Sequence, residues 1–90
     1  MNIRKIKLAL TVGLMNTPSG NVLQQTKELM QGFSSEVGSF LGLHVVDRSV
    51  LNQNHEKQRY ALRFERCTID LDLITNASTN TQVIRRFDLR

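Results

Sequence analysis

The sequence has few of the residues that mark several common classes of small protein. Cys67 is the single cysteine among 90 residues. It can form no internal disulfide, which argues against a disulfide-rich secreted scaffold. No cysteines or histidines occur at the close spacing typical of zinc sites. Glycine-rich phosphate-binding motifs are also missing, so the sequence predicts no cofactor and no metal site.

Long apolar runs are absent as well. No stretch approaches the roughly 18 apolar residues that a membrane-spanning helix needs, and we therefore expect no membrane partner. Arg4, Lys5 and Lys7, followed by the apolar residues 8–15, resemble a short signal peptide. Lys7 interrupts the start of this segment and no A-x-A cleavage site follows it. We interpret the segment as part of the mature fold and expect a cytoplasmic protein.

The overall composition is that of an ordinary globular domain. Hydrophobic residues make up 40% of the chain and charged residues 22%, so disorder is not the expected state. A chain of this length is one domain with a thin core, and we assign residues 1–90 to it. The net charge of +4 favours encounters with polyanions without choosing among them.

Residues 5–14 alternate between apolar and polar side chains. Every even position is apolar, namely Ile6, Leu8, Leu10, Val12 and Leu14. Strict alternation is typical of a strand with one buried face. A helix with Ile3, Ile6, Leu10 and Leu14 on one side fits fewer positions, so the pattern favours a strand.

After the turn-forming residues 16–21, the spacing between apolar residues changes from two to three and four positions. Apolar or small side chains recur at this spacing along one stripe, comprising Val22, Thr26, Leu29, Met30, Phe33, Val37, Phe40 and Leu41. This stripe predicts one amphipathic helix of about 20 residues that ends at Gly42.

The remaining chain is rich in strand-forming residues. Residues 43–51 predict a strand with a bulge or change of face near Val46. In residues 59–74 the apolar parity changes at Arg66-Cys67-Thr68, which indicates either a hairpin turn or a bulge in one long strand. We favour two strands there, followed by a last strand over residues 82–90.

These elements predict an α+β fold in two layers. One amphipathic helix packs on an antiparallel sheet of about five strands, in the order β-α-β-β-β-β. The order resembles cystatin-like and hotdog-like folds in topology only. The chain lacks the cystatin Q-x-V-x-G motif and offers no assignable hotdog carboxylate. The resemblance therefore implies no function.

Residues with reactive side chains form no convincing catalytic set. Cys67 with His44 or His55 would make a nucleophile and base, but no local motif supports the pair, and a small half-buried residue suits this position. Asp70 and Asp72 fall on the outward parity of their strand. We expect them to form cross-strand pairs with arginines rather than to act as acid and base.

Basic side chains fall on the outward parity of several predicted strands. These candidate contacts with a partner or polyanion are Lys5, Lys7, Arg59, Arg63, Arg86 and Arg90. If the strands are neighbours, the residues form a basic patch on the open face of the sheet. A platform for single-stranded nucleic acid also needs exposed aromatics, whereas Tyr60, Phe64 and Phe87 are predicted to face inward.

The leading functional hypothesis is a non-enzymatic protein-binding or assembly module that acts through a sheet face or an edge strand, including self-association. The segments to test first are the expected strand over residues 5–14 and the last strand, residues 85–90. A nucleic-acid-binding protein with a basic sheet face is the first alternative. A small ligand carrier or enzyme is the second, with a helix–sheet pocket lined by Met30, Phe33, Val37, Tyr60 and Phe64. A helix over residues 5–14, or an outward Tyr60 and Phe64, would favour base stacking instead.

Overall fold

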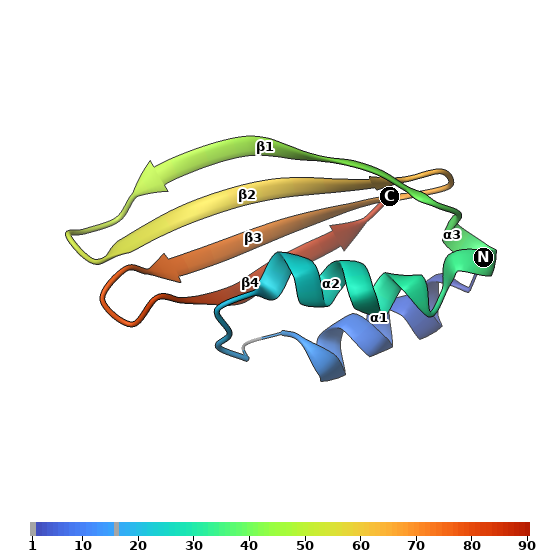
Figure 1. Ribbon diagram of the computed structural model, residues 1–90, viewed down its shortest axis with the longest axis horizontal. Coiled ribbons are helices and arrows are strands. Elements are labelled where there is room, and N and C mark those ends of the chain that lie inside the picture. The colour runs from blue at the N-terminus through green and yellow to red at the C-terminus, as the bar shows by residue number, and fades with distance from the viewer. Residues whose placement is uncertain (1, 16) are drawn as a thin grey trace.

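The computed structural model describes residues 2–15 and 17–90. Three helices precede four strands (Figure 1): α1 (Ile3–Gly13), α2 (Val22–Gln31), α3 (Ser34–Val37), β1 (Phe40–Val50), β2 (His55–Phe64), β3 (Thr68–Asn76) and β4 (Thr81–Leu89). The strands form one antiparallel sheet in the order β1-β2-β3-β4. Helices packed on an antiparallel sheet confirm the predicted α+β class, with four strands in place of about five.

The predicted N-terminal strand is wrong, because residues 3–13 form the helix α1. Ile6, Leu10 and Leu14 are buried, whereas Leu8 and Val12 are 64% and 75% exposed. The buried residues are four apart, and a spacing of four satisfies both the alternation of a strand and the face of a helix. The side chain of Asn2 caps α1 by accepting a hydrogen bond from the backbone N–H of Lys5 at 3.1 Å.

The single long helix predicted over residues 22–41 is divided. α2 ends at Gln31 and the single turn α3 ends at Val37. Gly38 then turns the chain into β1 with a φ of +83°, and a Cβ added there would lie 2.6 Å from the Cβ of Glu65. Only glycine tolerates both this backbone angle and this close approach. The predicted helix residues Phe40 and Leu41 therefore begin a strand.

The parity change at Arg66-Cys67-Thr68 is a hairpin, as favoured above. β2 ends at Phe64, whose N–H donates to the carbonyl of Cys67 at 2.8 Å. Glu65, Arg66 and Cys67 therefore connect β2 to β3. The bulge expected near Val46 is also present, because the β1–β2 register shifts between Val45 and Asp47.

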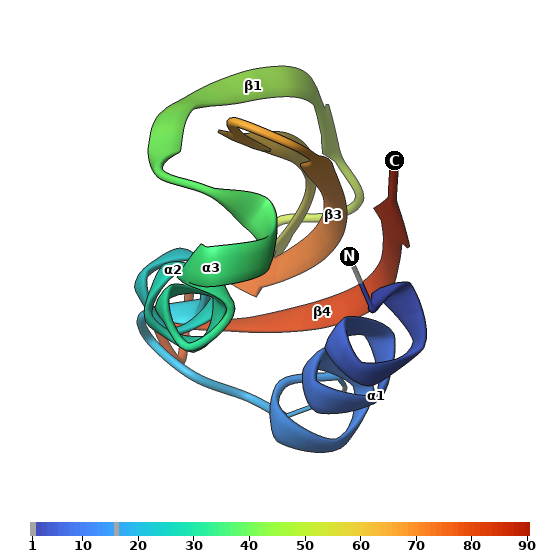
Figure 2. The same cartoon turned by 90° about the vertical axis from the view of Figure 1, so that its right-hand side faces the viewer.

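The core lies between the helices and the inner face of the sheet, by which we mean the face turned toward them. Its sheet side carries five fully buried side chains, Leu62, Ile69, Leu71, Leu73 and Ile84. Ile6, Leu10 and Met30 supply the helix side of the same cluster. Figures 1 and 2 show α1 and α2 near β4, whereas β1 lies at the far edge of the sheet. Cover by the helices therefore decreases from β4 toward β1.

The five residues proposed to line a helix–sheet pocket belong to this packed interior. Met30, Val37 and Phe64 are buried within the core cluster, and Phe33 and Tyr60 pack against it. The ring of Phe64 also meets that of Phe40 edge to face, with 5.5 Å between their centroids. These side chains fill space in the way that interior side chains of close-packed proteins do.

Candidate partner-binding edge

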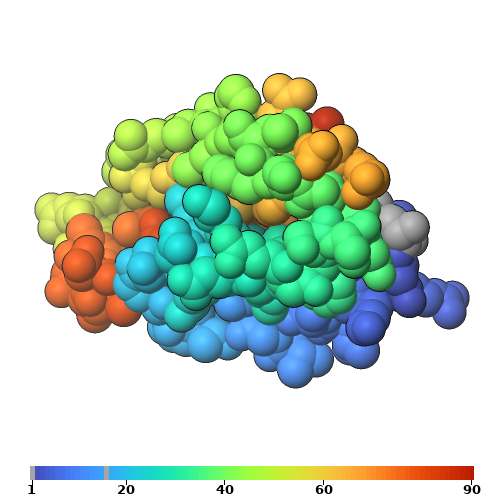
Figure 3. Space-filling view, turned by 45° about the vertical axis from the view of Figure 1, so that its right-hand side comes forward, coloured from blue at the N-terminus to red at the C-terminus, as the bar shows by residue number. Residues whose placement is uncertain are grey.

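The edge strand β1 carries an unusual concentration of exposed apolar side chains. The described part of the chain has nine exposed large hydrophobic residues, and six of them lie in or directly after β1: Leu41, Leu43, Val45, Val46, Val50 and Leu51. We call this set the β1 apolar edge. Figure 3 shows the green atoms of β1 at the surface, above the teal atoms of α2. An exposed, long and apolar edge strand is a template for pairing with another chain.

The sequence of β1 explains why apolar groups appear on both of its faces. Register shifts leave Leu41 and Val46 without a partner in β2. Because the bulge at Val46 adds one residue, Leu43, Val45 and Val50 all lie on the inner face although their positions differ in parity. Val46 itself lines the hollow on the outer face. Apolar residues on both faces are typical of a strand inside a sheet rather than at its edge.

The backbone of β1 is hydrogen-bonded on one side within the described residues, because β2 is its only neighbour in the sheet. The N–H of Leu51 donates to the carbonyl of His55 at 3.0 Å, which fixes the direction of the ladder at this end. Successive residues of an antiparallel strand direct their backbone N–H and C=O groups alternately toward one neighbour and the other. The bulge residues Leu41 and Val46 have no partner in β2 and are left out of this alternation. The backbone groups that point to the free edge therefore belong to Phe40, Leu43, Val45, Arg48 and Val50. Within the chain the outward N–H of Arg48 donates to Oδ1 of Asp47 at 2.8 Å.

The charges of the two ionised side chains of β1, Asp47 and Arg48, cancel each other. Arg48 donates from Nε to Oε1 of Glu56 at 2.7 Å. This hydrogen bond, together with the positive charge, lowers the pKa of the Glu56 carboxyl. Asp47 lies opposite Arg59 in the β1–β2 register. β1 contains neither lysine nor proline, two residues that commonly protect edge strands from association. The edge is thus close to neutral in a protein of net charge +4.

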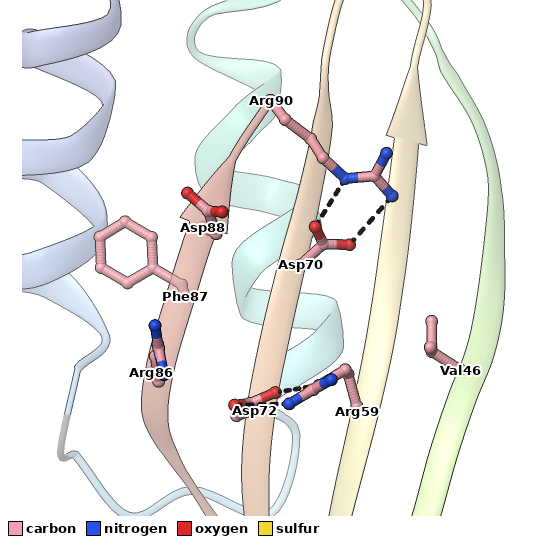
Figure 4. Close-up of a pocket in the computed structure, with 8 residues that line it drawn as sticks. All are labelled: Val46, Arg59, Asp70, Asp72, Arg86, Phe87, Asp88 and Arg90. Carbon is pink, nitrogen blue, oxygen red and sulfur yellow. Dashed lines mark hydrogen bonds and ion pairs between the residues drawn. The ribbon is translucent and has the colours of Figure 1, made fainter.

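The opposite edge of the sheet, β4, is partly covered by the N-terminal part of the chain. Ser19 and Gln82 exchange two backbone hydrogen bonds of 2.9 and 2.7 Å, and Met15 forms a parallel bridge with Ile84. Phe87 projects from β4 toward α1 in Figure 4. Residues 85–90, which the sequence suggested testing first, thus lie on the edge that has cover from its own chain.

The predicted basic patch is only partly assembled. Lys5 and Lys7 lie on α1 and not on a sheet strand, so they do not join the arginines as expected. Arg59, Arg63 and Arg86 lie on the exposed outer face, opposite the helices, and Arg90 directly follows β4.

Aspartates on the same face neutralise part of its positive charge. Arg59 pairs with Asp72 and Arg90 with Asp70, each through a contact of 2.7 Å, and Figure 4 shows both pairs. The pairs, with Arg86 and Asp88, line a shallow hollow of about 360 Å³. These cross-strand Arg–Asp contacts are of the kind that the sequence predicted for Asp70 and Asp72, and their partners are Arg90 and Arg59.

Aromatic side chains do not form a stacking platform on the outer face. Phe64 is buried, and Tyr60 is half-buried on the inner face with its hydroxyl donating to Oε1 of Gln58 at 2.8 Å. Phe87 is half-buried beside α1. Of the two findings that would favour base stacking, the helix over residues 5–14 is observed as α1. Tyr60 and Phe64 do not point outward, so the described residues offer no aromatic platform on which bases could stack.

Cys67 is placed poorly for nucleophilic chemistry. The side chain is buried, and burial raises the pKa of its thiol, which reduces the thiolate population. His55 lies at the opposite end of β2 from the hairpin that holds Cys67, and its Nδ1 is 3.0 Å from Oδ1 of Asn52. Within residues 2–15 and 17–90, no three His, Cys, Asp or Glu side chains are grouped so that they could hold a metal ion.

Comparisons with known proteins add no family. No family model, no curated protein and no solved structure matches the chain. No helix of the described residues combines the length and apolar character needed to cross a membrane.

Proposed function

We propose that this chain is a small, non-enzymatic protein-binding or assembly module that works by strand addition at β1. The observation that carries the proposal is the β1 apolar edge on a strand with one hydrogen-bonded neighbour. In strand addition the backbone provides affinity, and side chains at alternate positions provide specificity. β1 offers both kinds of contact along 11 residues.

Burial of the apolar edge contributes free energy that favours association. Complete burial of a Val or Leu side chain is worth about 1.5–3 kcal/mol. The six side chains are between 45% and 79% exposed, so covering each one would contribute about 1 kcal/mol. Lost translational and rotational freedom offsets much of this sum, and outward N–H and C=O groups add hydrogen bonds of about 0.5–1.5 kcal/mol each.

Polyanion binding by the outer face has weaker support. The net charge and the exposed Arg63 and Arg86 favour it. The ion pairs of Arg59 and Arg90 oppose it, because their aspartates would repel phosphates. Retention on an oligonucleotide column that falls steeply with salt, and that charge reversal of Arg63 and Arg86 abolishes, would establish this alternative.

A matched pair of variants tests strand addition at β1. Val50 and Val12 are 79% and 75% exposed on β1 and α1, so Val50→Lys and Val12→Lys make the same change at equally exposed sites. Each full-length chain is expressed in its own cells, cross-linked and analysed by mass spectrometry. We expect cross-links from β1 to a defined polypeptide, a second copy included, in the native chain and Val12→Lys and their loss in Val50→Lys. Cross-links that map elsewhere, or that survive Val50→Lys, would refute the proposal.

A further inference from the structure

The charge balance and side-chain pattern of β1 also indicate which strand it accepts. An added strand has to present outward backbone groups, carry apolar side chains on both faces and avoid adding positive charge to a protein that already carries +4. β1 has each of these properties itself. We infer that, within the strand-addition function proposed above, β1 pairs antiparallel with β1 of a second copy.

Such a pairing joins two four-stranded sheets into one continuous sheet. The two copies are related by a two-fold axis perpendicular to the sheet, so both helix layers lie on the same face. Each apolar edge then covers the other, and the interface is self-complementary, as two-fold symmetry requires. The ion pair of Arg48 with Glu56 leaves no unpaired cation on the inner face of the strand to oppose a second copy.

The positions of the outward backbone groups restrict where the axis can lie. Leu43, Val45, Arg48 and Val50 are spaced two, three and two residues apart, which is symmetric about the point between Val46 and Asp47. An axis at that point pairs Leu43 with Val50 of the second copy and Val45 with its Arg48. The four outward positions from Leu43 to Val50 are then used, and Val50, the most exposed of the apolar edge, is covered. The N–H of Arg48 exchanges its hydrogen bond to Oδ1 of Asp47 for one to the second copy.

An axis at His44 is the other symmetric choice, and it is less favourable. It would set Arg48 of the second copy opposite Phe40. The ammonium group of Lys27 already lies 4.7 Å from the centre of the Phe40 ring, so two cations would meet there. It would also leave Val50 outside the paired segment. The structure therefore favours the axis between Val46 and Asp47.

Sedimentation velocity of the full-length chain over a range of concentrations tests the pairing. We expect a monomer–dimer equilibrium in the native chain and in Val12→Lys. Val50→Lys should raise the dimer dissociation constant by about tenfold or more, with a melting temperature close to that of Val12→Lys. A native chain that stays monomeric at about 1 mM, or a dimer that Val50→Lys leaves intact, would overturn the inference.

Engineered cysteines test the position of the axis in a Cys67→Ala background. The proposed register places His44 opposite Ser49 of the second copy in a non-hydrogen-bonded pair, where Cα atoms lie about 4.5 Å apart, close enough for a disulfide. Within one chain these residues are five positions apart on an extended strand and cannot join. His44→Cys with Ser49→Cys should yield a disulfide-linked dimer on oxidation, and His44→Cys alone should not. Efficient linkage of His44→Cys alone would contradict the proposed pairing.

The same variants separate failure of self-pairing from failure of the proposed function. A chain that stays monomeric but forms Val50-dependent cross-links from β1 to a different polypeptide would refute self-pairing and leave strand addition standing. A monomeric chain with no cross-links from β1 in its own cells would refute both.

Discussion

Leu43 lies directly opposite Leu62 in the β1–β2 ladder, yet 45% of Leu43 is exposed and only 1% of Leu62. Two identical side chains on the same face of neighbouring strands thus differ because helix cover ends between them. The boundary of the core falls at β1, and this edge strand is left with apolar groups that its own chain does not bury. This difference leads to the first prediction.

Truncation of the two leucines should have very different effects on stability. Leu62→Ala removes a fully buried side chain and should lower the free energy of unfolding by about 2–5 kcal/mol. Leu43→Ala removes a half-exposed side chain and should cost less than about 1 kcal/mol in the monomer. Urea denaturation at low protein concentration measures both values. Similar losses in the two variants would mean that β1 is covered within the monomer.

A second pair of variants tests the helical state of residues 3–13. Leu10 is buried and Leu8 is exposed in α1, whereas a strand with one buried face would bury both. Leu10→Ala should lower the free energy of unfolding by about 2–5 kcal/mol, and Leu8→Ala should change it by no more than about 0.5 kcal/mol. Equal losses in urea denaturation would support the strand that alternation suggested.

Glycine at position 38 should be essential for the turn into β1. Gly38→Ala places a Cβ 2.6 Å from that of Glu65 on a backbone with a φ of +83°, and should cost about 1–3 kcal/mol. Gly42→Ala is the matched control, because a Cβ there meets nothing within 4 Å. Thermal unfolding compares the two. A Gly38→Ala variant as stable as Gly42→Ala would be inconsistent with this turn.

The carboxylate of Glu65 links the β2–β3 hairpin to the start of β1 and should make stability depend on pH. The backbone N–H of Ser39 donates to its Oε1 at 2.6 Å, and this hydrogen bond lowers the pKa of Glu65. Because the folded pKa is depressed, the stabilisation is present above the unfolded value of about 4.3 and is lost as pH falls through the folded pKa.

The stability lost by Glu65→Gln should therefore be larger at neutral pH than in acid. Urea midpoints of the native chain and the variant, measured from neutral to acidic pH, test this expectation. Glu28→Gln on α2 makes the same change of charge away from the hairpin and serves as the control. A difference between native chain and Glu65→Gln that stays constant on acidification would disprove the role of the hydrogen bond.

The sequence predicted those parts of the fold in which the spacing of apolar residues fits either a strand or a helix but not both. Tyr60, Leu62 and Phe64 share a parity that differs from that of Ile69, Leu71 and Leu73, and a hairpin separates the two sets. Residues 5–14 were misassigned because Ile6, Leu10 and Leu14 fit both periods, and because exposed Leu8 and Val12 completed the strand pattern. Only the packing of α1 against the rest of the chain distinguishes these alternatives.

The candidate site was harder to predict than the fold. Charge drew attention to Lys5, Lys7 and the arginines, but α1 removes the lysines from the sheet and aspartates pair with Arg59 and Arg90. The sequence did contain a signal for β1, in the irregular alternation of residues 43–51. Apolar residues on both parities indicate either apolar groups on both faces or a bulge between them, and the structure has the bulge at Val46. Strand order is needed to show that β1 is an edge, and sequence periodicity does not supply strand order.

Residue-resolved amide hydrogen exchange on β1 tests the central claim most directly. In dilute native chain, the outward amides of Leu43, Val45 and Val50 should exchange rapidly, and those of His44 and Ser49, which face β2, should be protected. Raising the concentration should slow exchange at the outward set, and Val50→Lys should prevent that slowing. Outward amides that are already protected in the dilute chain, or that still exchange rapidly when the chain is associated, would contradict strand addition at β1.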